Sequence, residues 1–223
     1  MKAKSKITID VLMTLLFLMQ MGYHMLDNRA HEWVGITLFA LFCVHHILNG
    51  GWYRSLFRGK WSAQRVLLTA VDVLLTLVMV AIIVSALFVS RHVFSFLGLH
   101  LRALGRRIHM PATMWGFVLM GLHLGLHWNR VLAGVRRRCH GKGSRAAVLA
   151  ARIALLLFAA FGVYEFVTRE LWMELFSLRE FAFLEYGETL PLFFASYVAI
   201  LAVWAACSYY LNRLLRGKRR INT

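Results

Sequence analysis

Cysteine, proline and acidic residues are scarce in this chain. Its 223 residues include 3 Cys, 2 Pro and 10 Asp or Glu. The cysteines (Cys43, Cys139 and Cys207) form no Cys-x-x-Cys pair, so the short cysteine motifs of metal and redox sites are absent. Hydrophobic residues make up 60% of the sequence, and the mean hydropathy is +0.62. This composition is typical of a polytopic helical membrane protein.

The shortage of acidic residues leaves a formal net charge of +16. Such a charge would also suit a protein that binds nucleic acid. The Lys and Arg residues, however, cluster between apolar stretches, and membrane topology explains that pattern better than phosphate contacts do. We therefore expect a lipid bilayer as the partner and no nucleic acid.

Six stretches with few charges are long enough to cross a bilayer. They are residues 7–25, 31–49, 66–89, 108–128, 147–167 and 190–211. Each has roughly the 20 residues that a transmembrane helix needs, and the hydrocarbon core favours helices because their backbone bonds are internal. The first stretch lacks a small-x-small cleavage site, so we interpret it as a retained helix. The sequence predicts an all-α, multi-pass membrane protein.

The distribution of Lys and Arg predicts the orientation. With the N-terminus inside, the inner segments carry 18 of these residues and the outer segments 7, while Arg152 lies within a span. Both termini are therefore expected inside. The basic segment 131–147 divides the chain into a four-span domain, residues 1–130, and a two-span hairpin, residues 148–223. The acidic outer loop of this hairpin, with Leu171, Leu175, Leu178 and Ala182 at helical spacing, is either an amphipathic surface helix or a solvated loop.

Two pairs of histidines share one interval. His31 and His45 are 14 residues apart, as are His109 and His123. Fourteen residues make four turns at 3.5 residues per turn, so the members of a pair face the same way, about 21 Å apart along the axis. The second and fourth spans both run from outside to inside. We therefore expect His31 opposite His109 at the outer level, and His45 opposite His123 at the inner level.

Opposed imidazoles at membrane depth are suited to haem. A histidine inside the bilayer is costly, so a functional role is the default interpretation. Two His ligands fill both axial positions of a haem iron, which favours electron transfer over oxygen chemistry. The core of a four-helix bundle is a known place for such a group. The sequence thus predicts two haem b groups, and without a Cys-x-x-Cys-His motif their attachment is non-covalent.

Other residues agree with a haem site. Gly116 lies midway between the two histidines of its span, and Gly35 lies one turn after the first histidine of the second span. Small residues there would let a flat macrocycle lie against the backbone, although glycine also serves plain helix packing. Arg91, Arg106 and Arg107 would lie near the outer haem, whose propionates need cations.

The inner site has alternatives on both helices. His46 adjoins His45 but points about 100° away around the helix. His127 lies one turn past His123, where it would bond a propionate or a quinone, or replace His123 as a ligand. The sequence leaves both choices open. The inner end near His127 and Trp128 is also a candidate quinone site.

Two stretches resemble a known family. The first reads Tyr23-His24 … His31-Glu-Trp-Val-Gly35 … His45-x-x-x-Asn49 … Trp52-Tyr53 … Gly59-Lys60. The second reads Ser90-Arg91 … His109 … Trp115-Gly-Phe-Val-Leu-Met120-x-Leu-His123-Leu-Gly-Leu-His-Trp128. Together they resemble the flavinylation-associated cytochromes, small bacterial membrane cytochromes, over about residues 5–130. The resemblance implies a four-helix dihaem cytochrome b of the cytoplasmic membrane, with His31, His45, His109 and His123 as ligands.

The leading hypothesis is a dihaem electron-transfer subunit of an oxidoreductase system, not a stand-alone enzyme. Electrons would pass between a quinol or another inner donor and an extracytoplasmic acceptor, for which the resemblance suggests a flavin-carrying protein. No flavin- or nucleotide-binding motif occurs in the chain itself. One alternative is a haem-free transporter or metal-permeation protein, with Asp10 and Asp72 as its intramembrane carboxylates. Another is a passive membrane anchor for a redox partner.

Overall fold

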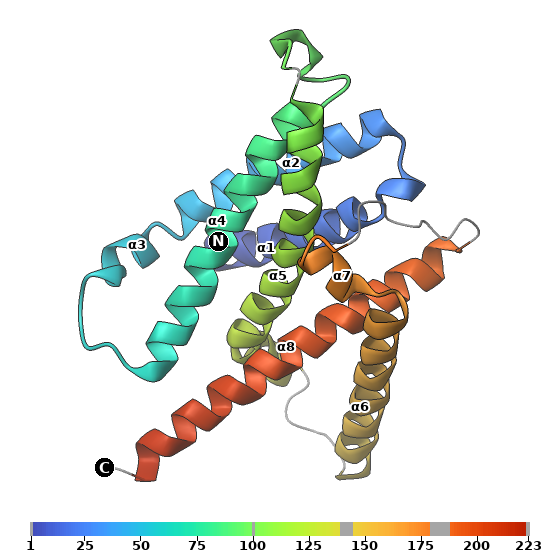
Figure 1. Ribbon diagram of the computed structural model, residues 1–223. Helices are drawn as coiled ribbons and strands as arrows, with labels where there is room; N and C mark the ends of the chain where they lie inside the picture. The colour runs from blue at the N-terminus through green and yellow to red at the C-terminus, as the bar shows by residue number, and fades with distance from the viewer. Residues whose placement is uncertain (1, 100, 139–144, 179–187, 222–223) are drawn as a thin grey trace.

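Helices account for all the regular structure in the described part of the chain. The computed structural model describes residues 2–99, 101–138, 145–178 and 188–221 (Figure 1). Six helices are long: α1 Lys2–Met21, α2 Asn28–Leu48, α4 Ala63–Val89, α5 Arg102–Arg138, α6 Arg145–Thr168 and α8 Leu190–Ile221. Four are short: α3 Gly51–Leu56, α7 Leu171–Leu175 and the 3-10 turns η1 Tyr23–Met25 and η2 Ser95–Leu97. The predicted all-α class is confirmed, and each predicted apolar stretch lies mainly within one long helix.

Local sequence explains where several helices begin and end. The Asp27 side chain accepts from the Ala30 backbone N–H at 2.6 Å and so caps α2. Ser62 caps α4 in the same way, accepting from the Arg65 N–H at 3.3 Å. Gly98 follows η2 with a φ of +60°, a conformation that glycine adopts without steric cost.

The four N-terminal long helices form two antiparallel pairs. Lys6 at the start of α1 bonds Asn49 just after α2, and Gln20 at the end of α1 bonds the His31 carbonyl at the start of α2. Helices α4 and α5 pack along their length, and α5 also packs against α8, which in turn packs against α6 (Figure 1). The α2–α5 pair is not among the extensively packed pairs in the described residues, although both helices carry paired histidines.

Helix α5 meets α8 at very short range around Gly125. A Cβ atom at Gly125 would overlap the Ala205 carbonyl and the Ser208 Oγ of α8. Two polar side chains of α8 also bond α5 carbonyls: Ser208 Oγ donates to Leu122 O at 2.7 Å, and Asn212 Nδ2 to Leu126 O at 3.3 Å. This contact fixes the rotation of α5 about its axis.

We expect Gly125→Ala to destabilise the protein by about 1–3 kcal/mol, because the added methyl group forces α5 and α8 apart. Thermal unfolding of the purified protein in detergent, followed by helix content, measures the change. Gly51→Ala is the matched control, since a Cβ at Gly51 meets no atom within 4 Å. If the two variants had equal melting curves, the close contact between α5 and α8 would have room for a methyl group at Gly125, which contradicts the prediction.

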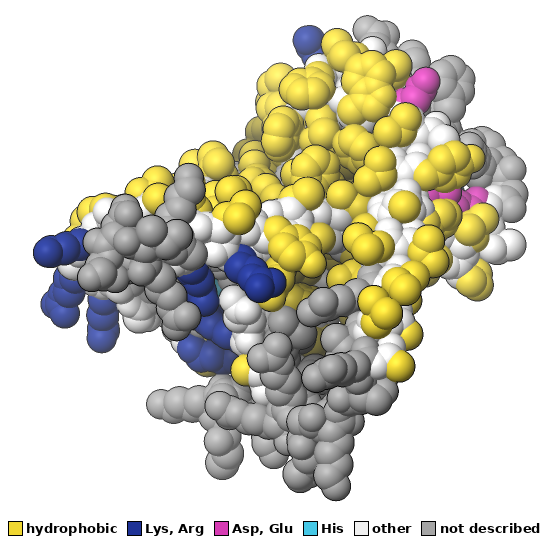
Figure 2. Space-filling model, turned by 90° about the horizontal axis from the view of Figure 1, so that it is seen from below, with side chains coloured by type: hydrophobic (Ala, Val, Ile, Leu, Met, Phe, Trp, Pro, Cys, Tyr) yellow, Lys and Arg dark blue, Asp and Glu magenta, His cyan; other side chains and the backbone are white. Residues whose placement is uncertain are grey.

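The surface is largely apolar, as expected for a protein in a bilayer. Large hydrophobic side chains lie exposed along the long helices, among them Ile47, Leu77 and Leu156. Figure 2 shows one such face, with Lys and Arg gathered mostly at one side of it. Within the described residues three segments are long and apolar enough to cross a membrane: Asn28–Leu48, Ala63–Val89 and Leu190–Arg216. The protein is therefore a membrane protein with at least these candidate spans.

The segment between α6 and α8 contains a short helix that packs on the bundle. Only α7, Leu171–Leu175, is helical in its described part, and Leu171 and Leu175 are buried against the bundle. The Trp115 indole N–H of α5 donates to the Leu175 carbonyl at 2.9 Å. Leu178 is exposed, and Ala182 lies outside the described residues. Leu171 and Leu175 thus dock the described part of this segment onto α5.

Arg169 holds the α6–α8 hairpin together beside α7. Its guanidinium bonds Glu165 at 2.7 Å, bonds Glu188 through two nitrogens, and lies near the Ser196 hydroxyl. The Glu188 side chain is only 4% exposed. Burial would by itself lower the pKa of Arg169, but its bonds to Glu188 and Glu165 raise the pKa above the ordinary value. Arg169 is therefore a permanent cation within a carboxylate pair.

Candidate functional site

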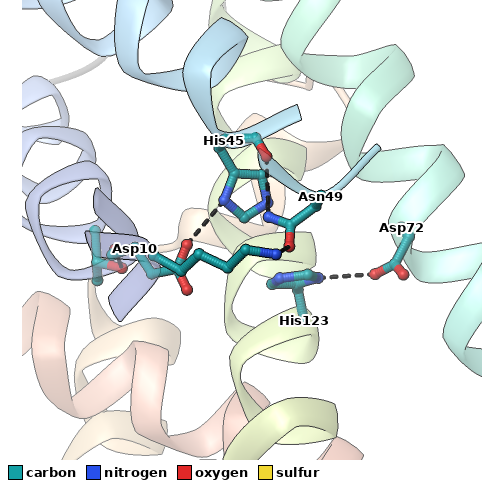
Figure 3. A network of polar contacts seen from close by, with 7 residues as sticks. Asp10, His45, Asn49, Asp72 and His123 are labelled. Carbon is teal, nitrogen blue, oxygen red and sulfur yellow. Dashed lines mark hydrogen bonds and ion pairs between the residues drawn. The ribbon is translucent and has the colours of Figure 1, made fainter. Parts of the chain in front are cut away.

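Four helices meet at the level of His45 and His123. His45 comes from α2 and His123 from α5, and Figure 3 shows their rings beside one another. The His45 Nδ1 lies 2.8 Å from Asp10 Oδ1 of α1, and the His123 Nδ1 lies 2.8 Å from Asp72 Oδ1 of α4. The structure thus brings His45 and His123 together, and each histidine also has a carboxylate partner on a neighbouring helix.

These carboxylates fix the proton on each imidazole. Against an ionised carboxylate, which only accepts hydrogen bonds, Nδ1 of each ring is the donor, and in a neutral ring Nε2 then keeps a lone pair. The surroundings of His45 agree, because the Asn49 amide nitrogen, a donor, lies 3.5 Å from Nε2 while Lys6 donates to Asn49 Oδ1 at 3.1 Å. Carboxylate-bound histidines of this kind are typical metal ligands.

The two alternative histidines lie at the same level. His46 bonds the Tyr53 hydroxyl through Nδ1, and its ring packs edge-on against Phe42 at 4.3 Å. His127 packs edge-on against His123, with ring centroids 4.6 Å apart. One ligand atom each of Asp72, His123 and His127 lies within 4.8 Å of the others, a grouping that also suits a bare metal ion.

The His31–His109 level has a different set of partners. The His109 Nδ1 lies 3.0 Å from the Ser85 Oγ of α4, and that hydroxyl donates its own proton to Ile82 O at 2.9 Å. His109 must therefore donate from Nδ1, which again leaves the lone pair on Nε2. His31 lies within electrostatic range of His109 and edge-on to the Tyr23 ring at 5.0 Å. The buried Nδ1 of His31 has no hydrogen-bond partner in the described part of the chain.

Glu32 ties this level to the loop that follows α4. Its carboxylate accepts from the Ser90 hydroxyl at 2.8 Å and from the backbone N–H groups of Arg91 and Val93 at 2.7 Å each. The His92 N–H donates to it as well. The bonds fix the start of α2 against the end of α4.

Neutralising Glu32 should loosen this loop. A hydrogen bond to a charged group contributes about 1.5–3 kcal/mol of stability. A change of about 1.4 kcal/mol alters an equilibrium constant tenfold. For Glu32→Gln we therefore expect the amide protons of residues 91–93 to exchange at least about tenfold faster. Hydrogen exchange read by mass spectrometry measures the rate, with the exposed helix cap variant Asp27→Asn as the control. Unchanged exchange at residues 91–93 would contradict the anchoring role of Glu32.

The glycines predicted to lie against a haem pack against neighbouring helices, and the arginines predicted near the outer haem have exposed side chains. A Cβ at Gly35 would meet the Gln20 amide nitrogen at 2.7 Å, and one at Gly116 would meet Ile82 at 3.0 Å and Phe17 at 3.3 Å. Both glycines therefore face neighbouring helices, as in ordinary helix packing. The side chains of Arg91, Arg106 and Arg107 are exposed near the His31–His109 end.

The sequence contained a signal for the two aspartates that motif spacing did not reveal. Asp10 and Asp72 are the carboxylates within the first and third predicted spans. Both lie near the end of the span that faces inside, which is the depth predicted for His45 and His123. Intramembrane carboxylates at the depth of a histidine are natural partners for it. No comparable feature of the sequence indicated the contact between Ser85 and His109.

No protein-family model matches the chain, and no match was found among curated proteins or solved structures. The function is therefore inferred from the residues and contacts themselves.

Proposed function

We propose that the chain is a b-type cytochrome of the membrane that carries electrons between two bis-histidine haems. The observation that supports this proposal most is that three of the four histidines have the same kind of hydrogen-bond partner at Nδ1. His45, His109 and His123 each have Nδ1 bonded to an oxygen on a neighbouring helix, an arrangement that would leave Nε2 as the atom available to a metal. His31, whose buried Nδ1 has no hydrogen-bond partner in the described residues, would complete the second pair with His109.

In this proposal all six long helices cross the membrane, with both termini inside. Helices α1, α2, α4 and α5 form the haem-binding bundle, and α6 with α8 forms an accessory hairpin packed on α5. His31 and His109 would hold the outer haem, and His45 and His123 the inner one. Because α2 and α5 are not extensively packed together, a planar group between them need not break a helix contact. Each haem would supply a one-electron carrier, which these residues hold and orient.

The partners of the imidazoles favour His45 and His123 as the inner ligands. Each has a carboxylate at 2.8 Å that fixes its tautomer and ring orientation. His46 is instead engaged at Nδ1 by Tyr53. His127 lies against His123, next to the exposed Trp128, and in this proposal it would bond a quinone or a propionate.

The proposed reaction takes electrons from a quinol or another inner donor and delivers them to an extracytoplasmic acceptor, which the sequence resemblance suggests is a flavin-carrying protein. The setting would be the bacterial cytoplasmic membrane. The reduced-minus-oxidised visible spectrum of the purified protein tests the proposal, and we expect the bands of a low-spin haem b. A protein expressed with haem available that shows no such bands would refute it.

A second candidate function is metal binding without haem, because Asp72, His123 and His127 already offer three clustered ligand atoms. Under this alternative the purified protein would contain a stoichiometric transition metal and no haem. Elemental analysis alongside the visible spectrum separates the two functions. His127→Ala would abolish metal content under the alternative, whereas the cytochrome proposal expects it to retain both haems.

A further inference from the structure

The two histidine levels differ in the charge of their hydrogen-bond partners. At the His45–His123 level, both Nδ1 atoms bond carboxylates, those of Asp10 and Asp72, each at 2.8 Å. At the other level, His109 bonds the neutral Ser85 hydroxyl, and the Nδ1 of His31 has no partner in the described residues. One level therefore has two anionic acceptors on its ligands, and the other has none.

The remaining charges near the two levels do not cancel this difference. Lys6 reaches the inner level only through the Asn49 amide oxygen, and Arg130 lies within electrostatic range of His127. At the outer level, the Glu32 carboxylate lies within electrostatic range of His31, but its hydrogen bonds go to Ser90 and to the backbone N–H groups of the loop. In the described residues it makes no hydrogen bond to the ring of His31 or His109. The exposed arginines Arg91, Arg106 and Arg107 add positive charge at that end.

An anionic acceptor changes what a histidine gives to a metal. When a carboxylate accepts the Nδ1 proton, the imidazole becomes a more basic ligand through Nε2. A more basic axial ligand stabilises ferric iron relative to ferrous iron, because the oxidised iron carries the higher charge. Hydrogen bonding to the axial ligands is one of the means by which proteins set a haem potential.

We infer that Asp10 and Asp72 are positioning residues that give the His45–His123 pair a lower reduction potential than the His31–His109 pair. The inference rests on the proposed function, since it concerns the haems which that function requires. It adds a direction of electron transfer to the proposed function. At equilibrium a single electron would reside mainly at the site of higher potential, which is the outer one. The arrangement therefore favours delivery of electrons from the inner face to the outer face.

Redox titration of the whole purified protein at fixed pH, followed in the visible spectrum, tests the inference. For the wild type we expect two components that differ at least tenfold in their ferric-to-ferrous ratio, or about 59 mV for one electron. Asp72→Asn keeps an oxygen for the His123 N–H but loses the charge, so the lower component should move to higher potential while the upper stays in place. Asp10→Asn should act in the same direction, and Asp72→Glu should restore the wild-type value.

Asp27→Asn is the matched control, because it neutralises an exposed aspartate whose side chain caps α2 by accepting from the Ala30 N–H. The His31 N–H bonds the backbone carbonyl of Asp27 at 3.0 Å, and the substitution keeps that carbonyl. Its two potentials should equal those of the wild type. A titration in which both haems are present, but Asp72→Asn and Asp10→Asn leave both potentials unchanged, overturns the inference and leaves the cytochrome proposal intact. Movement of the upper component in these two variants would overturn the inference as well. Absence of haem from the wild-type protein overturns the proposed function itself.

Discussion

Replacing His123 with leucine is expected to remove one of the two haems and to leave the other. In the proposed cytochrome, His123 would provide an axial ligand whose ring is held by Asp72, and leucine has no atom that binds iron. The His31–His109 pair has its own partners, Ser85 among them, and shares no residue with the inner level. Haem content per chain should therefore fall from two to one, as measured by haem extraction against protein concentration.

The reciprocal variant makes this prediction stricter. His109→Leu should also leave one haem, and the two variants should retain components of different potential. His92→Leu is the control, because its side chain is exposed in the loop after α4, and it should keep both haems. Loss of both haems in either single variant would contradict two independent sites. Full retention in His123→Leu would instead point to His127 as the inner ligand.

The second large effect is expected at Arg169. Arg169→Met removes the cation that forms ion pairs with both Glu165 and Glu188. The side chains of these two glutamates are 12% and 4% exposed. Breaking a buried ion pair by removing one partner costs about 3–5 kcal/mol, because an uncompensated charge stays behind. We therefore expect a marked loss of thermal stability, measured as helix content during heating in detergent, and a loosened α6–α8 hairpin.

Two further variants separate this cause from a general effect of losing an arginine. Arg58→Met removes an exposed arginine and should leave the melting temperature nearly unchanged. The double variant Arg169→Met with Glu188→Gln should recover part of the lost stability, because it no longer buries an unpaired carboxylate. If the double variant is less stable than Arg169→Met alone, the ion pair is not the origin of the effect.

The positions of the helices could be predicted because apolar runs of bilayer length leave few other structures open to the backbone. Their ends were less predictable. Helix α5 runs from Arg102 to Arg138, well beyond the predicted 108–128, because the arginine-rich flanks also favour helix. The short α7 could not be told from a surface helix by periodicity alone, since the same apolar spacing serves contact with lipid or with α5.

The histidines of the candidate site form a pattern in the sequence, and their hydrogen-bond partners do not. The 14-residue interval and the parallel spans predict a shared level for His45 and His123, and in the structure these two side chains lie beside one another. The bonds from Asp10 and Asp72 depend on how α1 and α4 rotate against their neighbours, and apolar periodicity does not determine that rotation at one residue. Gly35 shows the same limit, because its spacing fits a cofactor face whereas its contact is with Gln20.

Haem stoichiometry is the most direct test of the cytochrome proposal. Protein purified from haem-replete cells should contain two non-covalent haem b groups per chain, released by acidic acetone and absent from the denatured polypeptide. Their spectrum should be low-spin, since both axial positions are occupied by histidine. A preparation that folds as a helical membrane protein yet carries no haem, before and after incubation with added haem, would contradict the proposal.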